Sequence, residues 1–155
     1  LDALKPGKRL FLLSSGTGFA PFAALIREPE TYERFESIIV THTCRMIAEL
    51  SYSQSIIQEC NNDELVKEII DNKLLSYHST TRDNYIFNGR ITELISSGKL
   101  FNDLKINSIS TNDRFMFCGS MGLNNDLKKI MLENNFREGA NNYPGDFVLE
   151  KAFVG

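Results

Sequence analysis

The sequence predicts an α/β fold in which an open parallel sheet of about five strands carries helices on both faces. Two observations lead to this prediction. Short apolar runs alternate with stretches of helical character along the whole chain, which is typical of βαβ units. The unbroken β-branched run 38–40 fits a strand that is buried on both faces of a parallel sheet. Right-handed crossovers then place helices on both faces.

The first unit reads as a strand, a glycine-rich turn and a helix. The apolar run 10–14 leads directly into Gly16 and Gly18, and residues 20–26 have helical character. Pro21 suits the first turn of this helix, where its missing N–H costs no hydrogen bond. We expect Pro29 to end the same helix.

The remaining elements continue the alternation. Strands are expected over residues 35–43, 74–78, 114–118 and 146–150. Helices are expected over residues 48–59, 64–70, 90–97 and 123–134. Residues 80–89 are polar and irregular, which predicts a loop, and Gly98 is a typical helix stop. Residues 100–111 give no clear pattern.

Composition excludes several classes of protein. The chain of 155 residues has a formal net charge of −3, which argues against a general nucleic-acid binder. No apolar run approaches the roughly 20 residues that a membrane helix needs. Cys44, Cys60 and Cys118 form no CxxC pair and read as free thiols of a reducing compartment, so we expect a cytoplasmic protein without a metal site.

Ligands of open α/β sheets bind outside the carboxyl ends of the strands. This rule selects residues 15–21, 41–45, 80–90 and 118–122. In the first of these, Gly16 and Gly18 let the backbone turn tightly, and the following helix points unpaired N–H groups at the same spot. An anion such as a diphosphate fits there, although a tight turn without a ligand would have the same residues.

Arginines stand at two more of these strand ends. Arg45 follows one strand, and Arg82 and Arg90 flank the loop after the next. Because a guanidinium fork matches phosphate oxygens, three arginines beside a diphosphate turn favour the 2′-phosphate of NADP(H) over NAD(H). Tyr85 could stack on the adenine. Solvated surface charges are the alternative for each arginine taken singly.

The fourth strand end carries Cys118, Gly119 and Ser120. A thiol and a hydroxyl at such a place could lie beside a reacting ring. The alternative is a small buried thiol, which is what most free cysteines are. His42 and His78 fall within or at the end of strands, and we interpret both as packed histidines.

Several short motifs occur together in the order and spacing of one family. They are LLSSGTGFAPF (12–22), HTCR (42–45), ELSY (49–52), TRD (81–83), NGRIT (88–92), SGKLF (97–101), FCGS (117–120), PGDF (144–147) and AFV (152–154). From about Gly7 to Val154, the chain resembles the Rossmann-like NADP(H)-binding domain of bacterial-type ferredoxin/flavodoxin–NADP⁺ reductases.

The resemblance implies roles for individual residues. The cofactor diphosphate would lie on Gly16, Thr17 and Gly18, and the 2′-phosphate end on Arg45, Arg82 and Arg90. Cys118, Gly119 and Ser120 would line the nicotinamide side, with Cys118 and Ser120 as the catalytic candidates. Ala152 and Phe153 would contact FAD. The implied reaction is hydride exchange between nicotinamide C4 and flavin N5, after which the flavin exchanges single electrons with ferredoxin or flavodoxin.

The resemblance also implies a division of labour between domains. Such reductases carry an FAD-binding β-barrel with an Arg-x-Tyr-Ser/Thr motif, which this sequence lacks. We therefore expect residues 1–8 to be the end of a connector from that missing domain and residues 9–155 to be the NADP(H)-binding domain, without turnover of its own. Two alternatives are the nucleotide-binding module of an oxygenase-type flavin reductase and a non-catalytic nucleotide-binding module. The Ala-Phe-Val ending argues against the first of them.

Overall fold

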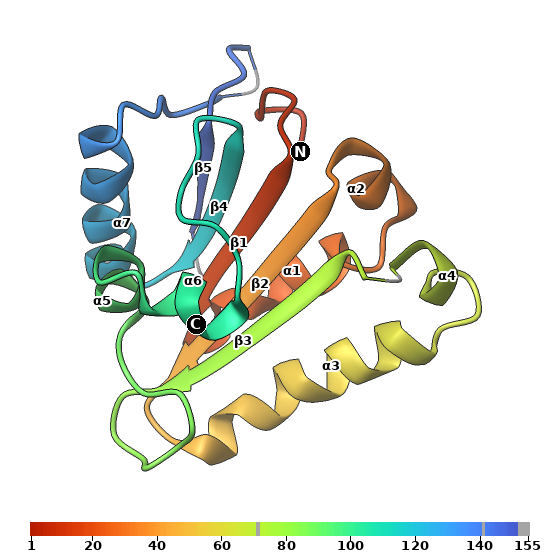
Figure 1. The fold of residues 1–155 in the computed structure, drawn as a ribbon, viewed down its shortest axis with the longest axis vertical. Helices are drawn as coiled ribbons and strands as arrows, with labels where there is room; N and C mark the ends of the chain where they lie inside the picture. The colour runs from red at the N-terminus through yellow and green to blue at the C-terminus, as the bar shows by residue number, and fades with distance from the viewer. Residues whose placement is uncertain (71, 141, 152–155) are drawn as a thin grey trace.

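One parallel sheet organises the chain. The computed structural model describes residues 1–70, 72–140 and 142–151. The five strands are β1 (Arg9–Ser15), β2 (Ser37–Cys44), β3 (Leu74–Thr80), β4 (Asp113–Gly119) and β5 (Phe147–Lys151). They lie in the order β3-β2-β1-β4-β5, and all pairs are parallel (Figure 1). The direction of strand progression reverses beside β1, which makes its carboxyl end the switch point of the sheet.

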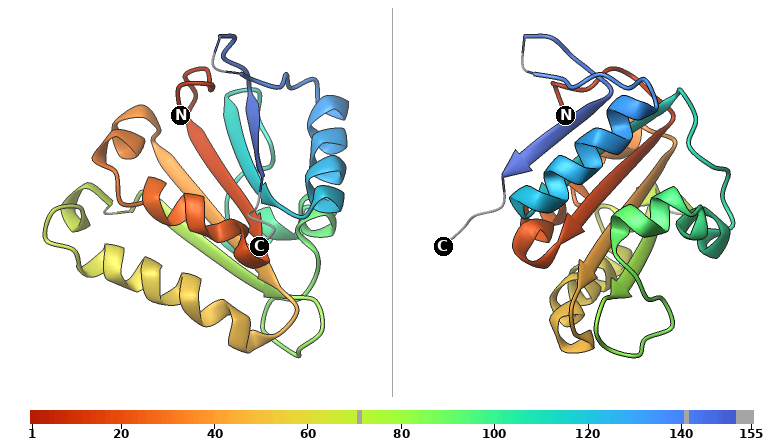
Figure 2. Two further views of the ribbon diagram at one scale, coloured as in Figure 1. Left: turned by 180° about the vertical axis from the view of Figure 1, so that it is seen from behind. Right: turned by 90° about the vertical axis from the view of Figure 1, so that its left-hand side faces the viewer.

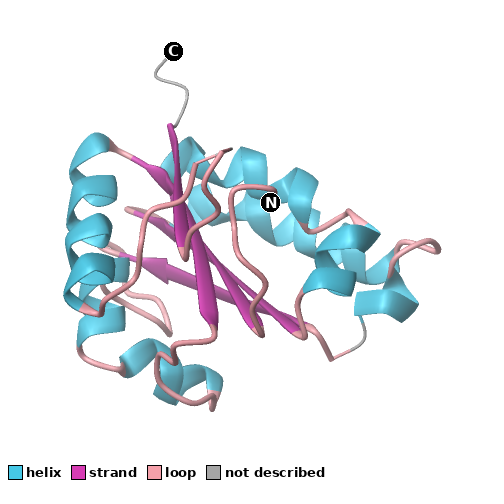
Figure 3. Cartoon of the chain, turned by 90° about the horizontal axis from the view of Figure 1, so that it is seen from above, coloured by secondary structure: helices cyan, strands magenta, loops and turns pink. Residues whose placement is uncertain are grey.

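Helices cover both faces of this sheet (Figures 2 and 3). One layer holds α1 (Ala20–Leu25), α2 (Pro29–Arg34), α3 (Ser51–Asn62) and α4 (Lys67–Ile70). The other holds α5 (Ile91–Ser96), α6 (Lys99–Leu104) and α7 (Met121–Glu133). Two 3₁₀ turns, η1 (Gly16–Phe19) and η2 (Ile47–Leu50), follow β1 and β2. The predicted fold class is confirmed.

Strand alternation divides the core into two halves. Leu10 and Leu12 of β1 pack in the cluster under α1–α4, whereas Phe11 and Leu13 pack in the cluster under α5–α7. All four side chains are fully or almost fully buried. An unbroken apolar run, as at residues 10–13 of β1, is what a sheet covered on both faces requires.

The structure corrects two expectations at the level of single elements. Pro29 does not end the first helix, which stops at Leu25; it opens the next helix, α2, where proline is well tolerated. The stretch without a clear pattern holds α6. This helix is short and lies between two left-handed residues, Gly98 and Lys105, which cut it off from any longer periodic pattern. In the described part of the chain, no helix is long and apolar enough to cross a membrane.

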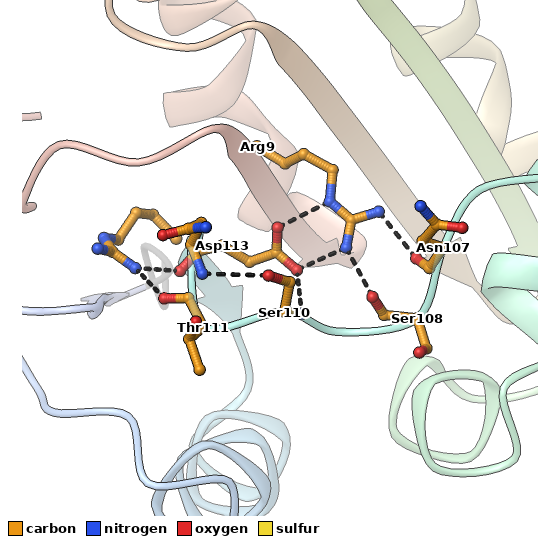
Figure 4. A network of polar contacts seen from close by, with 8 residues as sticks. Arg9, Asn107, Ser108, Ser110, Thr111 and Asp113 are labelled. Carbon is orange, nitrogen blue, oxygen red and sulfur yellow. Dashed lines mark hydrogen bonds and ion pairs between the residues drawn. The ribbon is translucent and has the colours of Figure 1, made fainter.

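A buried ion pair joins the amino ends of β1 and β4 (Figure 4). Arg9 Nε and Nη2 donate to the two carboxylate oxygens of Asp113 at 2.7 and 2.6 Å. The guanidinium also donates to the carbonyl oxygens of Asn107 and Ser108 at 2.8 and 2.9 Å. The Ser110 N–H donates to Asp113 at 2.8 Å. The network therefore fixes the loop before β4 at the end of the sheet opposite the predicted ligand edge.

Candidate functional site

A cleft of about 780 Å³ opens at the carboxyl ends of β1–β4. Each of the four predicted places contributes to its lining. The lining residues are Ser15, Gly16, Thr43, Cys44, Arg45, Met46, Glu49, Thr81, Arg82, Arg90, Ile91, Thr92, Ser120, Gly122, Leu123 and Asp126. The fold thus brings the four predicted segments, which lie far apart in the sequence, to one cavity. The size of this cavity suits a small-molecule cofactor.

The three predicted arginines converge on this cleft. Arg45, Arg82 and Arg90 are all exposed and all line it. Their guanidinium groups make no hydrogen bond or ion pair to any residue that the structure describes. Other arginines of the chain do pair with carboxylates: Arg9, Arg27, Arg34 and Arg114. Three free guanidinium groups around one cleft of an acidic chain favour a bound anion.

The glycine turn owes its shape to close backbone packing. Gly16 has a φ of +52°, which side-chain-bearing residues rarely adopt, and it lines the cleft. Gly18 is buried, and a Cβ at this position would overlap the Cys118 carbonyl group at the end of β4. Gly18 is therefore required by the contact between η1 and β4, whatever binds nearby. Thr17 lines a smaller, mostly apolar cleft of about 390 Å³ next to the main one, together with Tyr52.

The residues after β4 divide between core and cleft. The Cys118 side chain is fully buried in the core, so its thiol does not line the cleft, and burial raises its pKa. A Cβ at Gly119 would lie 2.5 Å from Ser15 Oγ and 2.6 Å from the Leu123 side chain, so these side chains would have to shift to accommodate it. Ser120 lines the cleft and caps α7, its Oγ accepting the Leu123 N–H at 3.2 Å.

Of the three remaining candidates, the structure describes one. Tyr85 is half-buried on the loop between β3 and α5 but does not line the cleft; its hydroxyl lies 3.5 Å from Gln54 Nε2. Ala152 and Phe153 lie outside the described residues. The adenine contact of Tyr85 and the flavin contacts of the other two stay predictions.

His42 holds the glycine turn from beneath. It is buried, as expected for a packed histidine, with Nδ1 2.6 Å from Ser53 Oγ and Nε2 2.7 Å from the Gly16 carbonyl oxygen. Because this oxygen can only accept, Nε2 carries the proton and donates. Burial lowers the pKa of His42, which favours the neutral ring. The sequence carries no local signal for this contact, because it depends on β1 and β2 being neighbours in the sheet.

Protonation of the histidine pair across β2 and β3 is expected to destabilise the fold. His78 lies opposite His42, its Nε2 is buried without a hydrogen-bond partner among the described residues, and burial lowers its pKa to about 4. Between its ordinary pKa of about 6.5 and that value, the unfolded chain binds a proton that the folded chain refuses, so unfolding becomes easier as the pH falls. One such group contributes up to about 1.4 kcal/mol per pH unit.

Urea denaturation at about pH 7.5 and about pH 5 measures this loss of stability. His78→Gln should reduce the difference between the two conditions, because glutamine does not titrate. An unchanged pH dependence in this variant would contradict the assignment.

Sequence reasoning missed several polar groups of the lining. They are Thr43, Glu49, Thr92 and Asp126. Thr43 stands at a strand end and Thr92 at the start of α5, so their positions carried a signal. Asp126 lies more than one turn inside α7, and only the packing of that helix brings it to the cleft.

Comparisons with known proteins agree along the whole chain. No family model matches it. It is 48% identical to the flavodoxin/ferredoxin–NADP reductase of Rhodobacter capsulatus, with 100% of this chain and 58% of the relative aligned. It is 44% identical to ferredoxin–NADP reductase A of Sorangium cellulosum, with 98% and 55% aligned. For the ferredoxin–NADP reductase of Azotobacter vinelandii, the identity is 40%, with 97% and 59% aligned. The chain thus spans somewhat less than three fifths of these curated relatives.

Solved structures share the fold. A ferredoxin NADP⁺ reductase from Neisseria gonorrhoeae with bound FAD and NADP superimposes with a TM-score of 0.82 at 23% identity, over 98% of this chain and 59% of that one. A flavohemoglobin from Malassezia yamatoensis reaches 0.65 at 16% identity, over 96% and 33%. By sequence along its whole length and by fold, the chain is a relative of the bacterial ferredoxin/flavodoxin–NADP reductases and corresponds to their NADP-binding domain.

Proposed function

We propose that this chain binds NADP(H) in the cleft and presents the nicotinamide for hydride exchange with FAD, which is held mainly by a domain outside this chain. One observation carries the proposal: Arg45, Arg82 and Arg90 surround one cleft without a carboxylate partner among the described residues, beside a glycine turn. The cleft is large enough for a nucleotide, and its donors are those that phosphate oxygens prefer.

The proposed roles are those that the family relationship implies, and of the residues concerned the three arginines, Gly16 and Ser120 line the cleft. The three arginines bind the 2′-phosphate end, and Gly16, Thr17 and Gly18 hold the diphosphate. Tyr85 stacks on the adenine. Ser120 orients the nicotinamide side, with Gly119 giving the backbone close approach and Cys118 packing beneath. Ala152 and Phe153 contact the flavin. The cofactors supply hydride transfer. The chain positions them, and its three arginines supply the positive charge of the anion site.

The wider setting is proposed on the names of the relatives. Residues 1–8 would connect to an FAD-binding domain, with residues 9–155 forming the NADP(H)-binding domain. The electron partner would be ferredoxin or flavodoxin, as in the reductases of Rhodobacter capsulatus and Sorangium cellulosum. Three free, buried cysteines support a reducing compartment such as the cytoplasm.

Calorimetric titration of this chain with 2′,5′-ADP and with 5′-AMP tests the proposal. We expect this chain to prefer the 2′-phosphorylated ligand. Arg82→Ala should weaken the binding of 2′,5′-ADP by about 1.5–3 kcal/mol, or about 10- to 150-fold in affinity, because a charge-assisted contact is lost. Binding of 5′-AMP should change little.

Arg137→Ala is the matched control, since Arg137 is exposed and lies outside the cleft lining. It should bind both ligands as the unchanged chain does. Equal affinity of the unchanged chain for both ligands would refute the arginine pocket, and no binding of any nicotinamide nucleotide at millimolar concentration would favour the non-catalytic module.

A further inference from the structure

The loops after β2 and β3 are joined by hydrogen bonds that centre on Asp83. The backbone N–H groups of Arg82 and Asp83 both donate to the Arg45 carbonyl oxygen, at 3.0 and 3.2 Å. In the opposite direction, the Ile47 N–H donates to Asp83 Oδ2 at 2.7 Å. Two of the three cleft arginines therefore sit on loops that Asp83 ties to each other.

Asp83 is also fixed on its own loop. Its carbonyl oxygen accepts from Thr80 Oγ1 and from Asn88 Nδ2, both at 2.9 Å. Thr80 is fully buried at the end of β3, so this bond connects the loop to the core. Phe87 of the same loop stacks on the buried Tyr77, with the ring centroids 4.5 Å apart. Because the backbone of Asp83 is fixed in this way, its side chain is well placed to hold the neighbouring loop through Ile47.

The position of Asp83 separates it from the ligand. Arg45 and Arg82 line the cleft, whereas Asp83 does not. Two guanidinium groups repel each other, and long exposed side chains lose entropy when they converge on one point. Fixing their backbones in advance lowers the entropic cost, because less freedom is left to lose on binding.

We propose that Asp83 is a positioning residue for 2′-phosphate recognition. It fixes the loop that carries Arg45 relative to the loop that carries Arg82, and it does not touch the ligand. The inference rests on the proposed function, and it extends that function to a residue outside the cleft lining. The preference for the 2′-phosphorylated nucleotide then depends on the hydrogen bond between the Ile47 N–H and Asp83, which joins the two loops.

The direction of the effect distinguishes positioning from simple charge. A carboxylate that acted only through its charge would repel the phosphate, so its removal would strengthen binding. A carboxylate that positions two arginines does the reverse, and its removal weakens binding. Asp126 provides the charge control, because it lines the cleft and its carboxylate makes no hydrogen bond or ion pair to a described residue.

The experiment compares Asp83→Ala, Asp83→Asn and Asp126→Asn by calorimetry with 2′,5′-ADP and 5′-AMP. We expect Asp83→Ala to weaken 2′,5′-ADP about tenfold or more while 5′-AMP changes less than about twofold. Asp83→Asn should stay within about threefold of the unchanged chain, because its amide oxygen can still accept the Ile47 N–H. Asp126→Asn should bind 2′,5′-ADP equally or more tightly.

Hydrogen exchange gives a readout that does not depend on the ligand. The Ile47 amide should exchange faster in Asp83→Ala and at the original rate in Asp83→Asn. Unchanged exchange, an unchanged ligand ratio, or tighter binding of 2′,5′-ADP in Asp83→Ala overturns the role of Asp83. If the unsubstituted chain does not prefer 2′,5′-ADP to 5′-AMP, the phosphate assignment itself is overturned. Failure of the proposed function is therefore distinguishable from failure of the role of Asp83.

Asp83 lies on a surface loop outside both hydrophobic clusters, so its alanine variant should fold. If that variant lacks native far-UV circular dichroism, Asn88→Ala tests the same loop from its other side. We then expect a loss of about threefold or more that is confined to 2′,5′-ADP. An unchanged ratio in this variant overturns the inference.

Discussion

Asp113→Ala is expected to destabilise the fold by about 3–5 kcal/mol, since it removes a buried carboxylate and leaves the largely buried Arg9 guanidinium without its partner. The Asp113 side chain is 1% exposed, and it accepts two hydrogen bonds from Arg9 and one from the Ser110 N–H. Its loss would also release the loop that Arg9 holds through two carbonyl oxygens. Such a cost is a large fraction of the stability of about 5–15 kcal/mol that a domain usually has.

Urea denaturation monitored by circular dichroism measures this effect, with Asp2→Ala as the control. Asp2 faces Arg34 at 3.9 Å, but its side chain is 97% exposed, so its removal should cost less than about 1 kcal/mol. Because Asp113 lies at the end of the sheet opposite the cleft, the folded variant should keep its affinity for 2′,5′-ADP. A cost of Asp113→Ala no larger than that of Asp2→Ala would contradict the prediction.

Gly18→Ala is the second substitution with a large expected effect. The added methyl group would overlap the Cys118 carbonyl group, and neither η1 nor the end of β4 can move without breaking strand contacts. We expect a loss of about 3 kcal/mol or more, at the upper end of the cost of overpacking a core. The glycine turn would also shift relative to Ser120, so binding of NADP(H) should weaken.

Gly122→Ala serves as the stability control, because a Cβ at Gly122 meets nothing within 4 Å. Within α7 it should be neutral or stabilise the fold by up to about 1 kcal/mol. Denaturation of both variants under the same conditions decides the matter. If Gly18→Ala were as stable as Gly122→Ala, the contact between η1 and β4 would not have the tightness described above.

Much of the fold could be predicted, because the signals lie within single segments. The apolar runs gave all five strands, and Gly98 was correctly placed as a helix stop. The start of α2 at Pro29 could not be predicted with the same rule, since proline both follows a helix end and opens a new helix. Along β4 the side chains alternate between the two halves of the core. Met116 and Cys118 pack in one cluster, and Phe115 and Phe117 pack in the other.

The cleft was predictable only as far as strand ends determine it. The rule for open sheets placed Arg45 and Arg82 at one edge, because Arg45 directly follows β2 and Arg82 lies two residues after the end of β3. The contacts of His42 with Gly16 and of Asp83 with Ile47 depend on which strands are neighbours and on how two loops pack. Such information is spread over the whole chain, and no local motif carries it.

The central place of β1 has a consequence for synthesis. This strand is synthesised before the other four strands, yet one of its two neighbours, β4, is made much later: Arg9 and Asp113 pair across a separation of 104 residues. Until β4 emerges, the apolar β1 has one edge open to other extended chains, and pairing over such distances is slow. The nascent chain therefore passes through a long period of vulnerability to aggregation, which ends only when β4 pairs with β1.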